Sequence, residues 1–317
     1  MFRHMKAIRS LRTHLFLSIA LLSCSNVQGD DIFVSGLKNG QGAIERIDSN
    51  GNKTVFASGL YTYGIAFGRD GNLYAAVEGD LAPGSGTIQK FDINGNASVV
   101  ASGLDRPSGI AFDHSEALYV VNGGNGTVKK LGVNGSFGNF ISGLNYEPRS
   151  LAFDSSGNLF VSSLGPSHPA FGIIQKFDSN GVLALWLSDA VSHPYGLAFD
   201  NNGNLFAAQT SNGTILKYDP SGNRTVYATG LNTPASLAFD SVGNLFVGDL
   251  GSRTIEKFDL NGNRSTFATG LDWPLFIAIQ TVPEPSYFVF VALALGGLLW
   301  SRARVSFPQG SEGGCGQ

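Results

Sequence analysis

The chain has 317 residues, 43% of them hydrophobic and 14% charged, with a net charge of −3 at pH 7. Residues 30–281 carry 15 Lys and Arg against 22 Asp and Glu, without the clustered basic residues that a nucleic-acid-binding surface needs. The two cysteines, Cys24 and Cys315, lie outside this range, so we expect it to use neither disulfides nor a thiol nucleophile.

The first 29 residues have the pattern of a secretory signal peptide. Basic residues are followed by an apolar stretch at 15–22 and then by small and polar residues that end at Gly29. The apolar stretch is too short for a stable membrane span. We expect cleavage after Gly29. Residues 21–24 also resemble a bacterial lipobox, which would instead leave a lipidated Cys24.

A phrase of the form Pro-x-Gly/Ser-Leu-Ala-Phe-Asp recurs six times along the chain. The residues that open the copies are 45, 41, 46, 40 and 40 positions apart: Thr62, Pro107, Pro148, Pro194, Pro234 and Pro274. Periods in this range indicate stacked structural repeats, and each copy divides into four short apolar runs. Four short strands per repeat are typical of a β-propeller blade.

The turns between the apolar runs favour strands over helices. Most follow an Asp-x-x-Gly-Asn pattern, as at 154–158, 200–204 and 219–223. The Asp side chain can bond the turn backbone, and Gly can take a positive φ. Runs of four to six residues between such turns, as at 205–208, are too short for typical helices.

The two ends of the repeated region complement each other. Residues 31–60 contain three apolar runs but lack the opening strand, whereas residues 273–280 form an opening strand without successors. Together they complete a sixth blade and leave no free sheet edge. Residues 30–281 are therefore predicted to form an all-β, six-bladed β-propeller of four-stranded antiparallel blades, closed by one C-terminal and three N-terminal strands.

The opening strand of each copy alternates small and large side chains. Alanine occupies one phase, as at Ala198, and bulky residues such as Leu197 and Phe199 occupy the other. Because alternate side chains of a strand face opposite sides, adjacent sheets can interdigitate near a crowded axis. The repeated aromatic residues are therefore predicted to be core.

The C-terminal segment resembles the PEP-CTERM sorting signal. Pro283, Glu284 and Pro285 precede the apolar run at 287–300 and two arginines, Arg302 and Arg304. The resemblance covers residues 282–304 and implies a C-terminal hydrophobic helix, processing by an exosortase, and a cell-envelope or exopolysaccharide-associated protein, exported and membrane-anchored before processing. The 14-residue run is short for a span, and a polar tail at 305–317 follows it. An ordinary C-terminal anchor predicts the same topology.

The repeats resemble the six-bladed NHL, SMP-30 and streptogramin-lyase-like propellers. The residues that carry this likeness are "PYGLAFD", "GNLFAA" and "GTILKYD" within 194–219, and the corresponding phrases within 234–259. Proteins with this fold include binding modules, lactonases and lyases, so the likeness does not choose among these functions.

A binding site is expected where the copies differ. In a four-stranded meander, the loop that enters the inner strand and the loop between the second and third strands share one face, which we call the loop face. The Asp-x-x-Gly-Asn turns lie on the opposite face, the turn face. Rigid scaffolds present binding residues on variable loops. The predicted ligand-binding residues on the loop face are Tyr63, Glu78, Arg106, Arg149, His168, Tyr195, Asp249 and Trp273.

The resemblance to lactonases implies a central Ca²⁺ held by carboxylate and amide oxygens. Candidate ligands are Glu78, Asn122 and Asp249, which form a sparse donor set. A lyase would need a base such as His193 or His168 near an acid such as Glu147. A Pro follows each of these histidines, a context typical of loop residues, and no catalytic motif of another class is present.

Three functions follow from these features. The first is an exported, non-enzymatic module that binds a polysaccharide, peptide or protein on its loop face. The second is a metal-dependent lactonase or lyase. The third is a structural matrix component in which the propeller spaces the anchor.

Overall fold

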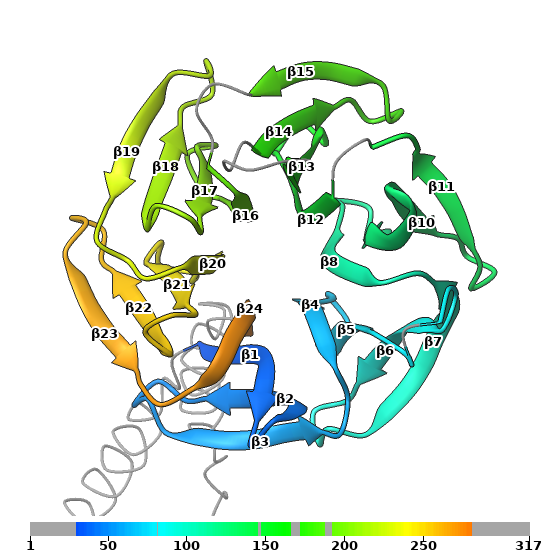
Figure 1. The fold of residues 1–317 in the computed structure, drawn as a ribbon, viewed down its shortest axis with the longest axis horizontal. Coiled ribbons are helices and arrows are strands. Elements are labelled where there is room, and N and C mark those ends of the chain that lie inside the picture. The colour runs from blue at the N-terminus through cyan, green and yellow to red at the C-terminus, as the bar shows by residue number, and fades with distance from the viewer. Residues whose placement is uncertain (1–29, 81, 145–146, 166–171, 188–191, 281–317) are drawn as a thin grey trace, which may run out of the picture. The chain divides into compact units, whose positions relative to one another are not determined.

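The computed structural model describes residues 30–80, 82–144, 147–165, 172–187 and 192–280. Within them, twenty-four strands form six four-stranded antiparallel sheets around a central axis (Figure 1). The predicted six-bladed propeller is thus confirmed. The predicted signal peptide, C-terminal helix and sorting motif lie outside the described residues, which contain no helix long and apolar enough to cross a membrane.

The six blades are numbered from the one that contains the N-terminal strand. Blade 1 comprises β24 (Asp272–Gln280), β1 (Asp31–Lys38), β2 (Gln41–Ile47) and β3 (Lys53–Ser58). Blade 2 comprises β4 (Thr62–Phe67), β5 (Leu73–Val77), β6 (Gly86–Phe91) and β7 (Ala97–Leu104). Blade 3 comprises β8 (Pro107–Phe112), β9 (Leu118–Asn122), β10 (Thr127–Leu131) and β11 (Phe137–Ile141).

The other three blades repeat the same order from the axis outward. Blade 4 comprises β12 (Glu147–Phe153), β13 (Leu159–Leu164), β14 (Gly172–Phe177) and β15 (Leu183–Leu187). Blade 5 comprises β16 (Pro194–Phe199), β17 (Leu205–Gln209), β18 (Thr214–Tyr218) and β19 (Arg224–Ala228). Blade 6 comprises β20 (Pro234–Phe239), β21 (Leu245–Asp249), β22 (Thr254–Phe258) and β23 (Arg264–Ala268).

The ring closes within blade 1, as the sequence predicts. The C-terminal strand β24 pairs antiparallel with β1, from Asp31 opposite Gln280 to Leu37 opposite Asp272. The inner strand β24 also contacts the inner strands β4 and β20 of the neighbouring blades. Both ends of the repeated region are therefore fixed in one sheet, and the ring has no open seam between blades 6 and 1.

Glycines let the inner strands approach one another at the axis. A Cβ atom on Gly64 would lie 2.4 Å from the Ser108 carbonyl oxygen and 2.8 Å from the Gly109 Cα. A Cβ on Gly196 would lie 2.5 Å from the Ala235 carbonyl oxygen. Real Cβ atoms do not come so close to a backbone, so Gly64 and Gly196 are required where the inner strands of these neighbouring blades approach each other.

Aromatic side chains fill the space between neighbouring blades. Phe160 of blade 4 packs edge-on against Phe199 of blade 5 with ring centroids 5.2 Å apart, and Phe206 of blade 5 meets Phe239 of blade 6 at 5.0 Å. The Leu or Ile two residues before each of the first-strand phenylalanines is buried, as at Leu197 and Leu237. The repeated aromatic and aliphatic residues are thus core, as the sequence analysis predicts.

A lysine in the third strand lies over the aromatic residue opposite it in the second strand. The Nζ of Lys176 is 5.2 Å from the Phe160 ring centroid and 3.5 Å from the Asp154 carboxylate. Lys130 lies in the same way over Tyr119, at 4.9 Å, and beside Asp113, at 3.8 Å. The lysine at this position of the third strand therefore serves the scaffold through cation–π and ion-pair contacts, a role that was not predicted from the sequence.

The turn-face hairpins are organised by their aspartates. In blade 1, Asp48 Oδ1 accepts hydrogen bonds from the backbone N–H groups of Asn50 and Asn52, both at 2.9 Å, and Oδ2 accepts one from the Asn52 amide at 2.9 Å. These bonds, led by the one from the Asn52 side chain, lower the pKa of Asp48. Gly51 completes the turn with a φ of 82°. The Asp and Gly of the turn pattern therefore have the roles predicted from the sequence.

Candidate functional site

The candidate site is a hollow beside the axis on the loop face, between the inner ends of blades 2, 3 and 4. Its volume is about 180 Å³. It is lined by five of the charged or aromatic residues singled out in the sequence, together with two prolines, a serine and a glycine: Tyr63, Glu78, Arg106, Glu147, Arg149, Pro107, Pro148, Ser108 and Gly123. We call it the axial hollow. Sequence positions that depart from the repeat thus converge on one place.

Arg149 is at the centre of the polar contacts in the axial hollow. Its Nη2 lies 2.7 Å from Glu147 Oε1, and its guanidinium lies over the Tyr195 ring, 5.8 Å from the centroid. Tyr195 in turn contacts Phe276 across the axis at 5.8 Å between centroids. The Nε of Arg149 is buried without a hydrogen-bond partner among the described residues. The guanidinium is therefore held in place while part of its donor capacity remains unused.

Both tyrosines beside Arg149 hold their phenolic protons more tightly than usual. Burial raises the pKa of Tyr195 to about 12. Burial also raises the pKa of Tyr63, and the charge of Glu78 together with a hydrogen bond to its carboxylate adds to this effect. At neutral pH both hydroxyls are protonated, so they are hydrogen-bond groups rather than bases.

The residue just before the opening residue of the repeat has an unusual backbone in four blades. Arg106, His193, Thr233 and Trp273 have φ values of 46°, 47°, 66° and 62°. In three of these residues the carbonyl oxygen accepts a hydrogen bond from the backbone N–H of the residue that follows the second strand. The bonds are Gly123 N to Arg106 O at 3.1 Å, Thr210 N to His193 O at 3.2 Å, and Leu250 N to Thr233 O at 3.2 Å. Left-handed non-glycine residues are uncommon and cluster at functional sites.

Two large aromatic side chains are exposed at this same position in adjacent blades. Trp273 of blade 1 is 58% exposed, and Tyr61, just before the inner strand of blade 2, is 55% exposed. Trp273 is one of the predicted ligand-binding residues, whereas Tyr61 is not among them. Tyr61 could have been predicted from the sequence, because it occupies the same position in the repeat as Arg106 and Trp273.

The structure does not bring the three candidate Ca²⁺ ligands together. Asn122 and Asp249 end the second strands of blades 3 and 6, on opposite sides of the ring (Figure 1). Each is buried and fixes the loop ahead of its own blade: Asn122 Oδ1 accepts from Asp105 N at 2.7 Å, and Asp249 Oδ2 accepts from Asn232 N at 2.9 Å. Glu78 lines the axial hollow instead. In the described ranges, no three His, Cys, Asp or Glu side chains form a group that could hold a metal.

The acid and bases proposed for a lyase are placed as follows. The carboxylate of Glu147 forms the ion pair with Arg149, and His193 lies one blade further on, in a left-handed conformation. Burial, as the largest cause, raises the pKa of Asp249 despite the hydrogen bond from Asn232. His168 lies outside the described residues. The carboxylate that a lyase would use as its acid is thus engaged by Arg149.

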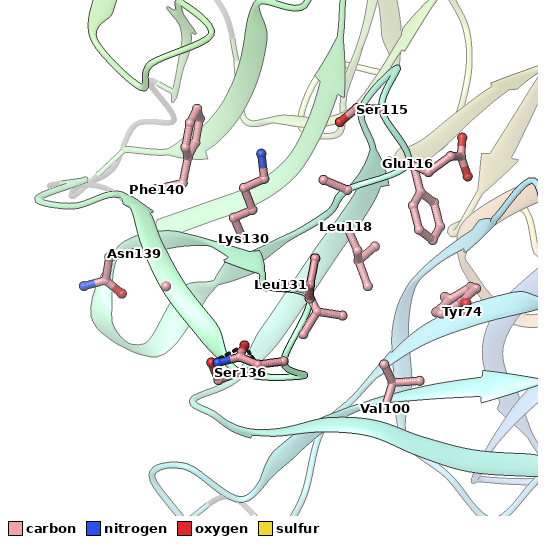
Figure 2. Close-up of a pocket in the computed structure, with 16 residues that line it drawn as sticks. Tyr74, Val100, Ser115, Glu116, Leu118, Lys130, Leu131, Ser136, Asn139 and Phe140 are labelled. Carbon is pink, nitrogen blue, oxygen red and sulfur yellow. Dashed lines mark hydrogen bonds between the residues drawn. The ribbon is translucent and has the colours of Figure 1, made fainter.

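A larger hollow lies on the turn face, between blades 2 and 3. It has a volume of about 700 Å³. Figure 2 shows Asn139 and Phe140 on one side of it, Tyr74 and Val100 on the other, and Lys130 with Leu131 between them. A hollow of similar volume lies between blades 4 and 5 on the same face. Both hollows lie on the face opposite the loop face, where the sequence predicts ligand binding.

Comparison with known proteins supports the fold. No protein-family model matches this sequence, and no curated protein is significantly similar to it. Among solved structures, the chain is similar to a propeller in a crystal structure of a nidogen/laminin complex, with a TM-score of 0.66 and 19% identity over 79% of this chain and 98% of that chain. At this level of identity the likeness shows the propeller fold alone.

Proposed function

We propose that the protein is a non-enzymatic interaction module that binds a peptide or protein segment on its loop face. The observation that carries this proposal is the convergence of Tyr63, Glu78, Arg106, Glu147 and Arg149 from three successive blades on the axial hollow. All of them occupy loop-face positions where the copies differ.

The side chains of the loop face have the chemistry of a protein-binding surface. Tyr, Trp and Arg are enriched among the residues that dominate interface energetics. Trp273 and Tyr61 supply exposed aromatic surface. Arg149 is held in place by Glu147 and Tyr195, and its Nε has no hydrogen-bond partner among the residues that the structure describes. Two guanidinium and two carboxylate groups line the hollow, which suits a segment that carries both apolar and charged side chains.

The structural neighbour is compatible with this function. It comes from a crystal structure of a nidogen/laminin complex, so a propeller of this fold occurs in an assembly of two proteins. The likeness to this neighbour supports the propeller fold alone. The choice of the loop face as the binding surface depends on the residues of this chain.

We further propose that the protein belongs with the NHL, SMP-30 and streptogramin-lyase-like propellers and is exported to the cell envelope. The repeat phrases, the signal-like residues 1–29 and the Pro283–Glu284–Pro285 motif support this assignment. An exosortase-type enzyme would then act on residues 282–304. Expression of the full chain in a Gram-negative host that encodes an exosortase should yield a protein that begins at Asp30. A mature protein that retains residues 1–29 would contradict export.

The binding function can be tested by selecting peptides from a displayed library on the purified full chain. The dissociation constant of a selected peptide should rise at least about tenfold for Trp273→Ala and for Arg149→Ala, since loss of an interface anchor costs more than about 1.4 kcal/mol. Val99→Ala, at a 63% exposed position on the outer strand of blade 2, should leave it unchanged. Equal binding by all three variants, or metal-dependent turnover of lactones by the full chain, would overturn the proposal.

A further inference from the structure

Blade 3 breaks the repeat on the turn face at several positions where most other blades agree. Its first turn carries Glu116 where blades 2, 4, 5 and 6 have Gly, and Ala117 where they have Asn. Glu116 adopts the left-handed φ of 64° that the glycines otherwise supply. Its second turn begins with Gly132, whereas the corresponding turns of blades 1, 2, 4, 5 and 6 begin with Asp.

The outer strand of blade 3 also departs from the repeat. By register, Gly138 lies opposite Lys130, where blades 1, 2, 5 and 6 have Thr54, Ser98, Thr225 and Ser265. Asn139 takes the position of Val55, Val99, Val226 and Thr266. A Cβ on Gly138 would meet nothing within 4 Å, so the space beside it is open.

All of these departures line the 700 Å³ hollow between blades 2 and 3, which we call the blade-3 hollow (Figure 2). Several replace a larger side chain with a smaller one: Ala117 for Asn, Gly132 for Asp and Gly138 for Ser or Thr. Blade 3 therefore lines this hollow with residues that the other blades do not carry at these positions. The similar hollow between blades 4 and 5 is lined instead by turns that keep the repeat residues, such as Asp200 to Gly203.

The charged side chains of the blade-3 hollow are already paired. Glu116 contacts Arg69 of blade 2, with Nε to Oε1 at 2.9 Å and the Arg69 backbone N to Oε2 at 3.0 Å. Lys130 lies between the Asp113 carboxylate and the Tyr119 ring. An ionic ligand would have to compete with these contacts, so the hollow favours a neutral ligand.

The floor and rim of the blade-3 hollow have different chemistry. Val100, Phe112, Leu118 and Leu131 give it an apolar floor. At the rim, the hydroxyl of Ser115 donates to Asp113 Oδ1 and that of Ser136 donates to Asn134 Oδ1, both at 2.7 Å. Because their protons are engaged, these hydroxyl oxygens can offer only lone pairs to a ligand. The exposed amide of Asn139 makes no hydrogen bond to another described residue.

We propose that the blade-3 hollow is a second binding site, which takes a residue of a neutral saccharide. Such a sugar has an apolar ring face for the floor and several hydroxyl donors for the acceptors at the rim, and it carries no charge. The volume lies within the range of about 300–1,000 Å³ that is typical of small-molecule sites. A neutral apolar peptide would match the floor but would offer few donors to the rim.

The test is to titrate the purified full chain with a panel of soluble neutral oligosaccharides of glucose, mannose, galactose and xylose. At least one should bind. Gly138→Thr restores the repeat residue and should weaken binding of that oligosaccharide at least about tenfold, because the larger side chain takes up space beside the ligand. Asn139→Val does the same at the next position and should weaken binding about fivefold, because an amide hydrogen bond is lost. Both variants place residues found at the same position in other blades, so we expect them to fold, and their melting temperatures check this.

Thr225→Gly, which makes the same exchange in reverse in blade 5, is the matched control and should bind as the parent protein does. Arg149→Ala should also retain saccharide binding, because Arg149 lies on the loop face and the blade-3 hollow lies on the turn face. Failure of the saccharide site can therefore be distinguished from failure of the proposed loop-face function. No binding of any oligosaccharide in the panel, unchanged affinity in folded Gly138→Thr and Asn139→Val, or capture of an apolar peptide instead would each overturn the proposal.

Discussion

The two faces of the propeller differ in how closely the blades agree. On the turn face, aspartates hold most of the hairpins in nearly the same way, as at Asp48 and Asp154. On the loop face, the residue before the opening residue of the repeat changes from Tyr61 to Arg106 to Trp273, often with a left-handed backbone. The hairpins of the turn face thus belong to the scaffold, and we assign ligand binding to the loop face.

Blade 3 sharpens this comparison because it departs from the other blades on both faces. Arg106 contributes to the axial hollow on the loop face, while Gly132 and Gly138 line the blade-3 hollow on the turn face. Variability marks a candidate binding surface wherever it occurs, so the turn face can carry a site where its own pattern is broken.

The largest expected effect tests the uniform scaffold at the axis. Gly64→Val should destabilise the protein by at least about 3 kcal/mol, because its side chain would collide with the Ser108 carbonyl and the Gly109 backbone, which cannot move without displacing blade 3. Chemical denaturation measures this. Gly138→Ala, where the added methyl meets open space, is the control. Similar stabilities for these two variants would show that the axis is not a packing constraint.

An intermediate effect tests the uniform turn face through pH. Hydrogen bonds from Asn52, Asn96 and Asn263 lower the pKa of Asp48, Asp92 and Asp259 in the folded state. Since the folded pKa lies below the unfolded value, this stabilisation is fully present above about pH 4 and is lost as the pH falls through the lowered folded pKa. We expect denaturant midpoints to drop in this acid range.

Replacing the three aspartates by asparagine should reduce this acid dependence, because the new side chains do not titrate. Asp249 acts in the opposite direction: its folded pKa is raised, so its contribution is present at low pH and is lost as the pH rises toward that value. Asp249→Asn should therefore make the loss of stability in acid steeper. An unchanged acid profile in the triple variant would contradict the role given to the turn aspartates.

The smallest effect tests the strained backbone of the loop face. Thr233 is β-branched and has a φ of 66°, which is costly for such a residue. Thr233→Gly should raise the stability by about 0.5–1 kcal/mol after the extra entropy of the unfolded chain is allowed for. Thr233→Ala, which keeps a Cβ, should show less gain in the same thermal denaturation experiment. Equal stabilities of the two would show that the left-handed backbone carries no strain.

The fold could be predicted almost completely from the sequence, because each of its rules is local and repeated six times. The spacing of Thr62, Pro107 and the later opening residues sets the blades, and the strand at 273–280 without successors shows how the ring closes. The cation–π contact of Lys176 with Phe160 was not predicted, since it depends on cross-strand register.

The candidate site was predicted in part. Tyr63, Glu78, Arg106, Glu147 and Arg149 meet because loops at equal positions of neighbouring blades lie side by side. Asn122 and Asp249 were considered as Ca²⁺ ligands, but their side chains bond the backbone of the preceding loops, a direction that strand alternation alone does not reveal. The blade-3 hollow was not predicted, because the sequence does not show which residues of neighbouring blades lie together around one hollow.

Hydrogen–deuterium exchange of the full chain, with and without a selected peptide ligand, tests the central claim most directly. If the loop face is the binding surface, the peptide should slow exchange in the segments 105–109, 147–151 and 272–276 and leave the turn-face segments 113–117 and 132–139 unchanged. Protection confined to the turn-face segments, with none at the axial hollow, would contradict the account.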